Sequence, residues 1–191
     1  ERKHSLHDDY VKFIRLSESL IEKNGEGVLG FITNHGYLDN PTFRGMRWHL
    51  MQTFDKIHVV DLHGNSKRGE IAPNRIKDEN VFDIQQGVSI IIAIKKRLPK
   101  KEKKSEVTFS EIWGSRELKY SKLNSLDRAK ISSKKLSPSE PYFTFNGKGV
   151  AVAAYQDCFS IAEIFPLNTT GIQTSRDPVA LGESNSEIQK V

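Results

Sequence analysis

Hydrophobic positions along the first half of the chain recur at spacings that alternate between those of helices and those of strands. Apolar residues at three- and four-residue intervals predict one helix over residues 8–23 and a second that begins near Pro41. Short apolar runs predict strands at 27–33, 56–62 and 87–95, the first covered on both faces. Helix, strand, helix, strand is the order of parallel βαβ units, so the pattern predicts an α/β fold.

The second predicted helix carries one apolar stripe, and a basic residue falls on it. The stripe consists of Phe43, Met46, Arg47, Leu50, Met51 and Phe54. Asn40 precedes Pro41 and is expected to cap this helix, with the proline at its first position.

The strand at 87–95 is reached through residues 63–80, which show no helical pattern. A parallel neighbour would need a crossover helix, so we expect this strand to run antiparallel at the edge of the sheet. The parallel strands before it would then leave an unpaired edge, through which the chain could dimerise or borrow strands.

The character of the chain changes from Lys95 onward. The run KKRLPKKEKK has seven basic residues in ten, which suits phosphate contacts and a solvated linker equally well. Alternating residues at 106–114 predict a further strand, and residues 115–131 have room for a short helix.

Composition narrows the class of protein only in part. The 191 residues, 37% hydrophobic and 28% charged, predict one domain, or a domain plus an irregular appendage, with a modest core and much solvated loop. A net charge of +5 permits an anionic partner without requiring one. The single cysteine, Cys158, excludes an internal disulfide and a thiolate zinc cluster, and no metal site is predicted. No apolar run is long enough to cross a bilayer. The missing initiator Met fits a chain whose front has been cut away, although trimmed leading residues would look the same.

Two candidate ligand motifs have ordinary structural explanations. Gly25, Gly27 and Gly30 match GxGxxG, but they close a helix and enter a strand, the reverse of a dinucleotide-binding turn. They therefore predict a helix stop and strand glycines. Asp61 ends a parallel strand, at the edge where open α/β sheets bind ligands. It could anchor a ligand or form a turn.

Several longer strings carry a resemblance to a known family. In chain order they are DDYVKF, GVLGFITNHGYLDNPTFRGMR, FDKIHVVDLHGN, DENVFDIQQGVSIIIAIKK and GIQTSRD. Together they resemble the C-terminal half of adenine-N6 DNA methyltransferases of the restriction–modification type. The resemblance is to large single chains that join a methylase to a target recognition domain, often with nuclease or helicase parts. It covers Asp8 to about Lys96 well and continues loosely to Asp177.

The resemblance implies a partial Rossmann-like methyltransferase sheet with a final antiparallel edge strand, followed by an irregular α+β extension. Residues 1–96 would be the C-terminal half of the catalytic domain, 97–175 a basic linker and extension toward a target recognition domain, and 176–191 a linker or disordered tail. The full-length enzyme would transfer a methyl group from S-adenosylmethionine to adenine N6 in double-stranded DNA, in a prokaryotic cytoplasm. Its partners would be DNA and the upstream half of the methyltransferase domain, with no membrane.

The resemblance also implies roles for three aromatic residues. Phe82 matches the phenylalanine that stacks on the target adenine, which must leave the duplex to be methylated. From the residues alone, Phe82 could instead fold back onto the sheet edge. Phe13 matches the position that packs on the adenine ring of the cofactor, with Tyr10 beside it. Phe13 also fits a core position of an amphipathic helix.

One departure from the family limits what this chain could do. The glycine-rich loop, the acidic ribose ligand and the Asn-Pro-Pro-Tyr tetrad precede this segment in the family, and the sole Asn-Pro here starts a helix. The resemblance therefore implies no catalytic residue in the chain, which would be inactive alone and would bind the cofactor weakly or not at all. Contacts to the DNA backbone are expected from Lys95, Lys96, Arg97 and Arg176. The alternative is a non-catalytic DNA-binding or specificity module.

Overall fold

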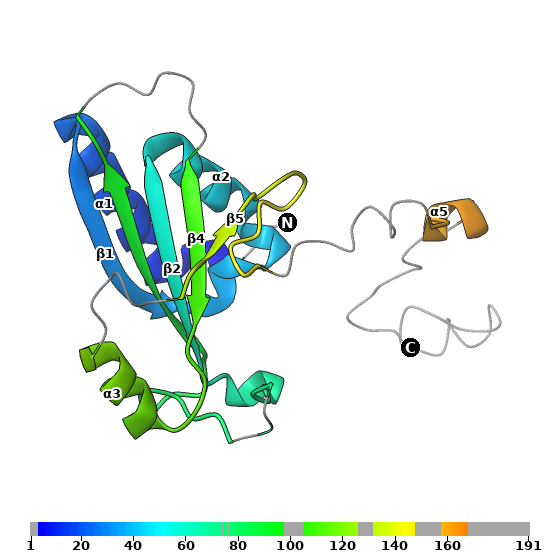
Figure 1. The fold of residues 1–191 in the computed structure, drawn as a ribbon. Coiled ribbons are helices and arrows are strands. Elements are labelled where there is room, and N and C mark those ends of the chain that lie inside the picture. Colours follow the sequence, from blue (N-terminus) through cyan, green and yellow to red (C-terminus); the bar gives the residue numbers. More distant parts are fainter. Residues whose placement is uncertain are drawn as a thin grey trace, which may run out of the picture. The chain divides into compact units, whose positions relative to one another are not determined.

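The structure, a computed structural model, describes residues 4–73, 75, 77–97, 105–125, 132–147 and 158–167. The chain divides into two compact units, 1–149 and 150–191. The first unit contains a sheet flanked by helices (Figure 1). The described part of the second unit contains α5 (Ile161–Ile164), which begins with reciprocal hydrogen bonds between Ser160 and Glu163.

The sheet of the first unit has five described strands. They are β1 (Gly27–Asn34), β2 (Lys56–His63), β3 (Val88–Lys95), β4 (Glu106–Glu111) and β5 (Lys134–Leu136), in the spatial order β1-β3-β2-β4-β5 (Figure 1). β3 pairs antiparallel with both β1 and β2, so these two strands run in the same direction on either side of it. β4 is parallel to β2, and β5 is antiparallel to β4. The carboxyl ends of β1, β2 and β4 therefore meet at one edge of the sheet.

The α/β class and the antiparallel direction of β3 are confirmed, but the predicted edge position of β3 is wrong. β3 lies between β1 and β2, where Ile91 and Ala93 are fully buried. The crossover through α2 (Arg44–Thr53) leaves a gap one strand wide, and the loop after β2 returns the chain into it. β4 and β5, from residues 97–175, extend the same sheet. The predicted domain limits stay predictions.

β1 is an edge strand of the described sheet, and the expectation that both its faces are covered is wrong. Leu29 is buried under the helices, whereas Val28 and Ile32 on the other face are 65% and 54% exposed. An apolar run alone does not tell whether a second layer is present.

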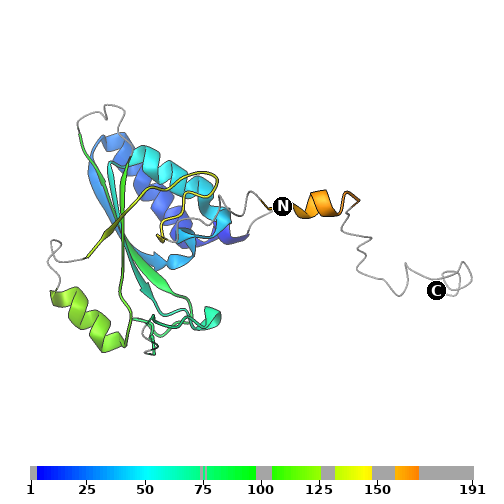
Figure 2. The ribbon, with the colours of Figure 1, turned by 45° about the vertical axis from the view of Figure 1, so that its right-hand side comes forward.

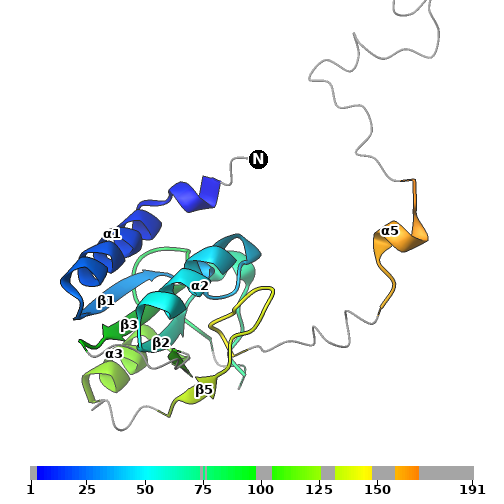
Figure 3. The same cartoon turned by 90° about the horizontal axis from the view of Figure 1, so that it is seen from above.

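The two helices of the βαβ pattern cover one face of the sheet, and a third lies across from them. α1 (Asp9–Asn24) and α2 pack on the same side, as the edge-on view of Figure 2 and the view from above in Figure 3 show. α3 (Arg116–Ser125) lies on the opposite side. The helix stop predicted at Gly25 is confirmed, because this residue has φ +84° and donates its N–H to the last turn of α1.

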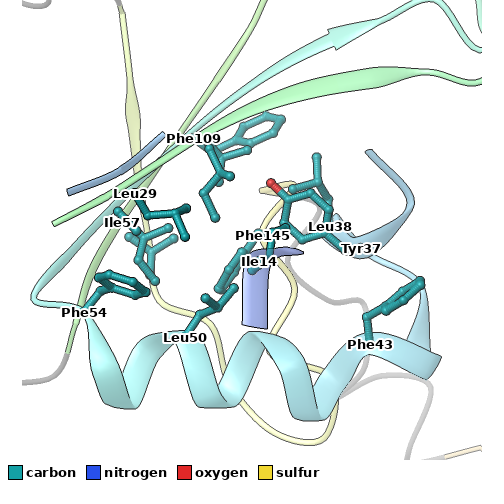
Figure 4. Packing of buried hydrophobic residues seen from close by; sticks show 14 residues of the cluster. Ile14, Leu29, Tyr37, Leu38, Phe43, Leu50, Phe54, Ile57, Phe109 and Phe145 are labelled. Atoms are coloured by element: carbon teal, nitrogen blue, oxygen red, sulfur yellow. The ribbon is translucent and has the colours of Figure 1, made fainter. Parts of the chain in front are cut away.

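The main hydrophobic core fills the layer between the sheet and the helices α1 and α2 (Figure 4). It is formed by Ile14, Leu29, Tyr37, Leu38, Phe43, Leu50, Phe54, Ile57, Val59, Ile91, Ala93, Val107, Phe109 and Phe145. A smaller cluster on the other face joins the end of β2 to α3; it consists of Val60, Leu62, Val81, Val88 and Ile112, with Ile90 and Leu123 against it.

Four short helical turns lie before α1 and in the loops after β1 and β2. They are η1 (His4–His7), η2 (His35–Leu38), η3 (Pro41–Phe43) and η4 (Ser66–Arg68). The predicted cap at Asn40 is confirmed, because its side chain accepts the N–H of Thr42 and Pro41 takes the first helical position. Among the described residues no helix is long and apolar enough to span a membrane.

Candidate functional site at the carboxyl ends of the strands

The loops that follow β1 and β2 meet at the edge predicted for ligand binding. The Nδ1 atom of His35, just after β1, lies 3.0 Å from Oδ1 of Asp61 in β2. The side-chain nitrogen Nδ2 of Asn65 lies 3.0 Å from Nε2, the other ring nitrogen of His35. The same oxygen of Asp61 accepts the N–H of His63 at 2.9 Å, which confirms the predicted turn role of this carboxylate. A ligand-anchoring role for Asp61 stays a prediction.

Two glycines allow the backbone segments at this edge to approach closely. A Cβ at Gly87 would lie 2.3 Å from the ring of His35, so this ring occupies the space of the missing side chain. Gly64 has φ +80°, and a Cβ there would lie 2.5 Å from Cα of Asn80. Both positions therefore require glycine because of the close contacts, and Gly64 also because of its conformation.

The segment that carries Phe82 is held by the side chain of Asn80. Its Oδ1 accepts the N–H of Phe82 at 2.9 Å, and its Nδ2 donates to the carbonyls of Gly64 and Gln86 at 3.0 and 2.8 Å. Val81 takes the buried position next to it, and Phe82 is 43% exposed. The side chain that enters the core is thus Val81, and the ring of Phe82 remains available to solvent.

Replacing Asn80 by alanine is expected to loosen this segment. The change removes three hydrogen bonds, each contributing about 0.5–1.5 kcal/mol net, so we expect the free energy of unfolding to fall by about 2–3 kcal/mol. Hydrogen exchange at the amide of Phe82 should become faster. Asn80→Asp keeps the acceptor for that amide and should show a smaller increase. Equal protection of the amide in wild type and Asn80→Ala would contradict this role.

A buried ion pair between Asp78 and Lys119 ties the segment that carries Phe82 to α3. Lys119 and Asp78 are both essentially inaccessible, with Nζ and Oδ1 2.8 Å apart. Lys119 also donates to the carbonyls of Leu62 and Glu79, and Asp78 accepts the N–H groups of Gly64 and Gly114. Every charge in this pair thus has additional partners, which a buried ion pair needs.

An open cavity of about 610 Å³ lies beside Phe82. Its lining includes Asn65, Glu70, Asn80, Phe82, Gln85 and Arg116. Arg116 donates hydrogen bonds to the carbonyl of Asn80 and, at 2.7 Å, to the carboxylate of Asp83. The hydrogen bond with Asp83 raises the pKa of the Arg116 guanidinium. The cavity therefore combines an exposed aromatic ring, amides and charged groups of both signs, a mixture suited to a polar planar ligand.

Tyr10 and Phe13, the two residues predicted to meet a cofactor, both lie on α1. Tyr10 is half-buried, with ring centroids 6.5 Å from Tyr37 and 6.2 Å from Phe43, and its burial raises the pKa of its hydroxyl. Phe13 is 55% exposed, so the interpretation of Phe13 as a core residue is wrong. α1 covers the face of the sheet opposite α3, to which the Phe82 segment is bonded.

The basic residues predicted to meet DNA lie far from Phe82. Lys95 ends β3, and β3 begins at the edge where Phe82 lies, so about 23 Å of strand separates them. Lys96 and Arg97 are exposed at the far edge, with Arg97 3.9 Å from Glu26. Arg176 lies outside the described residues. The DNA contacts of all four residues stay predictions.

The fold and the site thus define an α/β protein. At the edge formed by the carboxyl ends of its parallel strands, hydrogen bonds hold a loop that carries the exposed ring of Phe82. No protein-family model and no curated protein matches the sequence. Solved structures do match. The ATP-dependent Type ISP restriction-modification enzyme LlaBIII bound to DNA is 26% identical, with a TM-score of 0.69 over 97% of this chain.

Two further structures are similar in fold. A cryo-EM structure of a DrdV–DNA complex is 24% identical over 73% of this chain, with a TM-score of 0.61. A nuclease-deletion mutant of the Type ISP restriction-modification enzyme LlaGI, in complex with a DNA substrate mimic, is 24% identical over 71%, with a TM-score of 0.60. The chain spans only 12% to 13% of the length of these three proteins.

Proposed function

We propose that this chain is a part of a restriction–modification enzyme that acts on DNA, namely the C-terminal half of its adenine-N6 methyltransferase domain and the start of the extension that follows. The observation that carries the proposal is the exposed ring of Phe82, held by Asn80 beside a cavity at the carboxyl edge of the sheet. It is supported by the likeness to LlaBIII, a restriction-modification enzyme, over nearly the whole chain.

In this proposal the chain contributes recognition of the target base. An adenine that leaves the duplex loses its stacking, and the ring of Phe82 would replace part of it, at about 1–3 kcal/mol per base. The hydrogen bonds of Asn80 and the bond from Tyr120 to the carbonyl of Val81 hold the backbone that carries the ring before the base arrives. Such preorganisation lowers the entropy lost on binding.

S-adenosylmethionine, when bound to the full-length enzyme, would supply the methyl group. This chain could contribute only aromatic side chains to the cofactor site. Phe13 presents an exposed ring, and Tyr10 lies one turn away on the same helix. The family's tetrad, which orients the amine, is not in this sequence. The chain therefore positions the base, and the chemistry of methyl transfer would belong to residues upstream.

The upstream half of the domain has a surface to dock on. Phe13, Leu16 and Leu20 form an exposed apolar stripe along α1, each more than half exposed. On the opposite face of the sheet, Val28 and Ile32 of β1 are exposed as well. Exposed apolar surface of this kind marks an interface, and here we assign it to the rest of the catalytic domain. A dimer through the edge of β1 is the alternative.

Phe82→Ala in the longer enzyme tests the proposed role. We expect the fluorescence rise of 2-aminopurine at the target position to be lost. The affinity for DNA with an intact, paired adenine at the target position should fall by about 5- to 150-fold, which corresponds to one stacked base. Phe82→Trp should retain both signals. Ile84→Ala is a matched control, because Ile84 is also about half exposed and lines the same cavity. Normal base flipping in Phe82→Ala would exclude the stacking role.

The 191-residue chain alone is expected to show no methyl transfer. The measurement is incorporation of labelled methyl groups from S-adenosylmethionine into adenine-containing DNA, with the longer enzyme as the positive control. Transfer by the isolated chain would refute the division of labour proposed above. If instead the longer protein binds DNA in a salt-dependent way that is independent of cofactor, and transfers no methyl group, the non-catalytic DNA-binding module is the better account.

A further inference from the structure

His63 is a buried histidine whose two ring nitrogens have no hydrogen-bond partner among the described residues. It is 5% exposed, and neither Nδ1 nor Nε2 makes a hydrogen bond to the described residues. Its backbone has φ +53°, a conformation that non-glycine residues rarely adopt, and it follows a register shift in β2. The ring stacks on Trp113 with centroids 3.4 Å apart. Backbone strain and an unpartnered buried imidazole are both costly, so their combination points to a function.

Acidic groups surround the two nitrogens of His63. Carboxylate oxygens of Asp61 and Glu70 lie 3.6 and 3.7 Å from Nδ1, and one of Glu111 lies 3.4 Å from Nε2. These separations are too long for hydrogen bonds. The separation between Nδ1 and Glu70 is close to the spacing of two ligands around one ion, because two atoms each 2.1 Å from a tetrahedral metal lie about 3.4 Å apart.

His35 provides a second nitrogen that is already oriented. Ligand atoms of His35, His63 and Glu70 all lie within 4.8 Å of one another. The Nδ1 atom of His35 is held by Asp61 at 3.0 Å, and the ring sits in the space left by Gly87. A carboxylate that holds one nitrogen of a histidine while the other faces the ion is a common outer shell of metal sites. Here that other nitrogen is in contact with the amide of Asn65, which an ion would displace.

The surroundings offer the space and the charge that a cation needs. A cavity of about 30 Å³ is lined by His35, Asp61, His63, Glu70 and Glu111, among other residues. The oxygen Oε2 of Glu70, which lies 3.7 Å from Nδ1 of His63, also accepts the backbone N–H of Asn65 at 3.2 Å. The loop therefore holds this carboxylate in place beside the histidine.

We propose that His35, His63 and Glu70 form a binding site for a divalent first-row metal ion, with Asp61 orienting His35. Two imidazoles and one carboxylate suit zinc and disfavour magnesium and calcium, which prefer oxygen ligands alone. The ion would join the end of β1, the end of β2 and the loop 64–70, and so rigidify the edge that carries the Phe82 segment. The inference rests on these contacts and does not depend on methyl transfer.

The test uses the whole 191-residue chain, stripped with a chelator and titrated with zinc by calorimetry. We expect one ion per chain and a rise in the melting temperature. His63→Ala and the isosteric Glu70→Gln should each weaken zinc binding at least about tenfold. His58→Ala is the matched control, because it removes a histidine from the same strand without touching the cluster. Cobalt should give the visible absorption of a low-coordinate site in wild type and lose it in both cluster variants.

Three results would overturn the proposal. The first is absence of zinc binding by a folded wild-type chain, which would leave the cluster as a histidine packed among carboxylates. The second is equal binding by wild type, His63→Ala and Glu70→Gln, which would place the ion elsewhere on the chain. The third is a loss in His58→Ala as large as in the cluster variants. Circular dichroism of each metal-free variant establishes that it is folded, and Glu70→Gln keeps the test valid if His63→Ala is not.

Discussion

Replacing Arg47 by alanine is expected to lower the free energy of unfolding by about 3–5 kcal/mol. Arg47 is fully buried in α2, and its guanidinium donates to the carbonyls of Tyr37, Asn40, Tyr142 and Phe143 at 2.6–3.0 Å. Burial lowers the pKa of the guanidinium to about 10, partly offset by Asp39, so it remains charged at neutral pH. The substitution removes the donor from all four carbonyls, and only that of Asn40 keeps another one, the N–H of Phe43.

Two further variants separate the causes of this loss. Arg47→Met fills the volume without donating, so it should recover only the part of the loss that comes from the cavity. Arg44→Ala, on the exposed side of the same helix, should change stability by less than about 0.5 kcal/mol. The measurement is urea unfolding at neutral pH, followed by tryptophan fluorescence. A loss below about 1 kcal/mol for Arg47→Ala would contradict the stabilising role of these hydrogen bonds, because an unpaired buried carbonyl alone costs that much.

The position of Arg47 illustrates what periodicity can and cannot predict. The spacing of apolar residues placed it on the inward stripe of a helix, and α2 confirms that placement. Its partners in Tyr142 and Phe143 lie 95 and 96 residues further along, in a segment with no regular pattern. Local spacing shows which side of a helix faces inward, but it does not show which distant segment meets it there.

The sequence pattern could not predict the order of the strands, for the same reason. The apolar runs that became β1, β2 and β3 were each recognisable, and the missing crossover helix correctly predicted the direction of β3. Whether β3 pairs at the outside or between β1 and β2 depends on which arrangement buries Ile91 and Ala93, and both arrangements satisfy the same local pattern. Strand order is a property of the whole sheet.

The candidate site was predictable only as far as single residues carry a motif. Phe82 was identified from the residues that surround it in the sequence. The edge of the sheet expected to bind a ligand was identified from the direction of the strands. The cluster of His35, His63 and Glu70 was missed, because neither the spacing of 28 residues between the histidines nor their neighbours match a metal-binding motif. The usable signal was positional, since both histidines directly follow or end parallel strands.

Gly64→Ala is expected to destabilise the chain by about 2–4 kcal/mol and to displace the segment that carries Phe82. The positive φ of Gly64 costs a residue with a side chain about 1 kcal/mol. The new Cβ would also lie 2.5 Å from Cα and 2.9 Å from Cβ of Asn80, a contact with backbone that no rotamer change relieves. Overpacking of this kind adds about 1–3 kcal/mol.

Gly69→Ala separates the strain from the contact. Gly69 also has a positive φ, +59°, but a Cβ there meets nothing within 4 Å. It should therefore lose only the conformational part, about 1 kcal/mol, and leave Asn80 in place. The difference between the two variants, measured by urea unfolding, isolates the contact between Gly64 and Asn80.

The same pair of variants connects the packing to the proposed function. Moving Asn80 breaks the hydrogen bond that holds the N–H of Phe82, so Gly64→Ala in the longer enzyme should lose 2-aminopurine fluorescence as Phe82→Ala does, while Gly69→Ala keeps it. Equal stability of the two glycine variants would show that the Asn80 backbone yields without cost. Intact base flipping in a destabilised Gly64→Ala would show that the ring of Phe82 does not depend on its anchored loop. The close approach of two backbones, one residue from His63 and two from Phe82, is thus where fold and proposed function are most tightly joined.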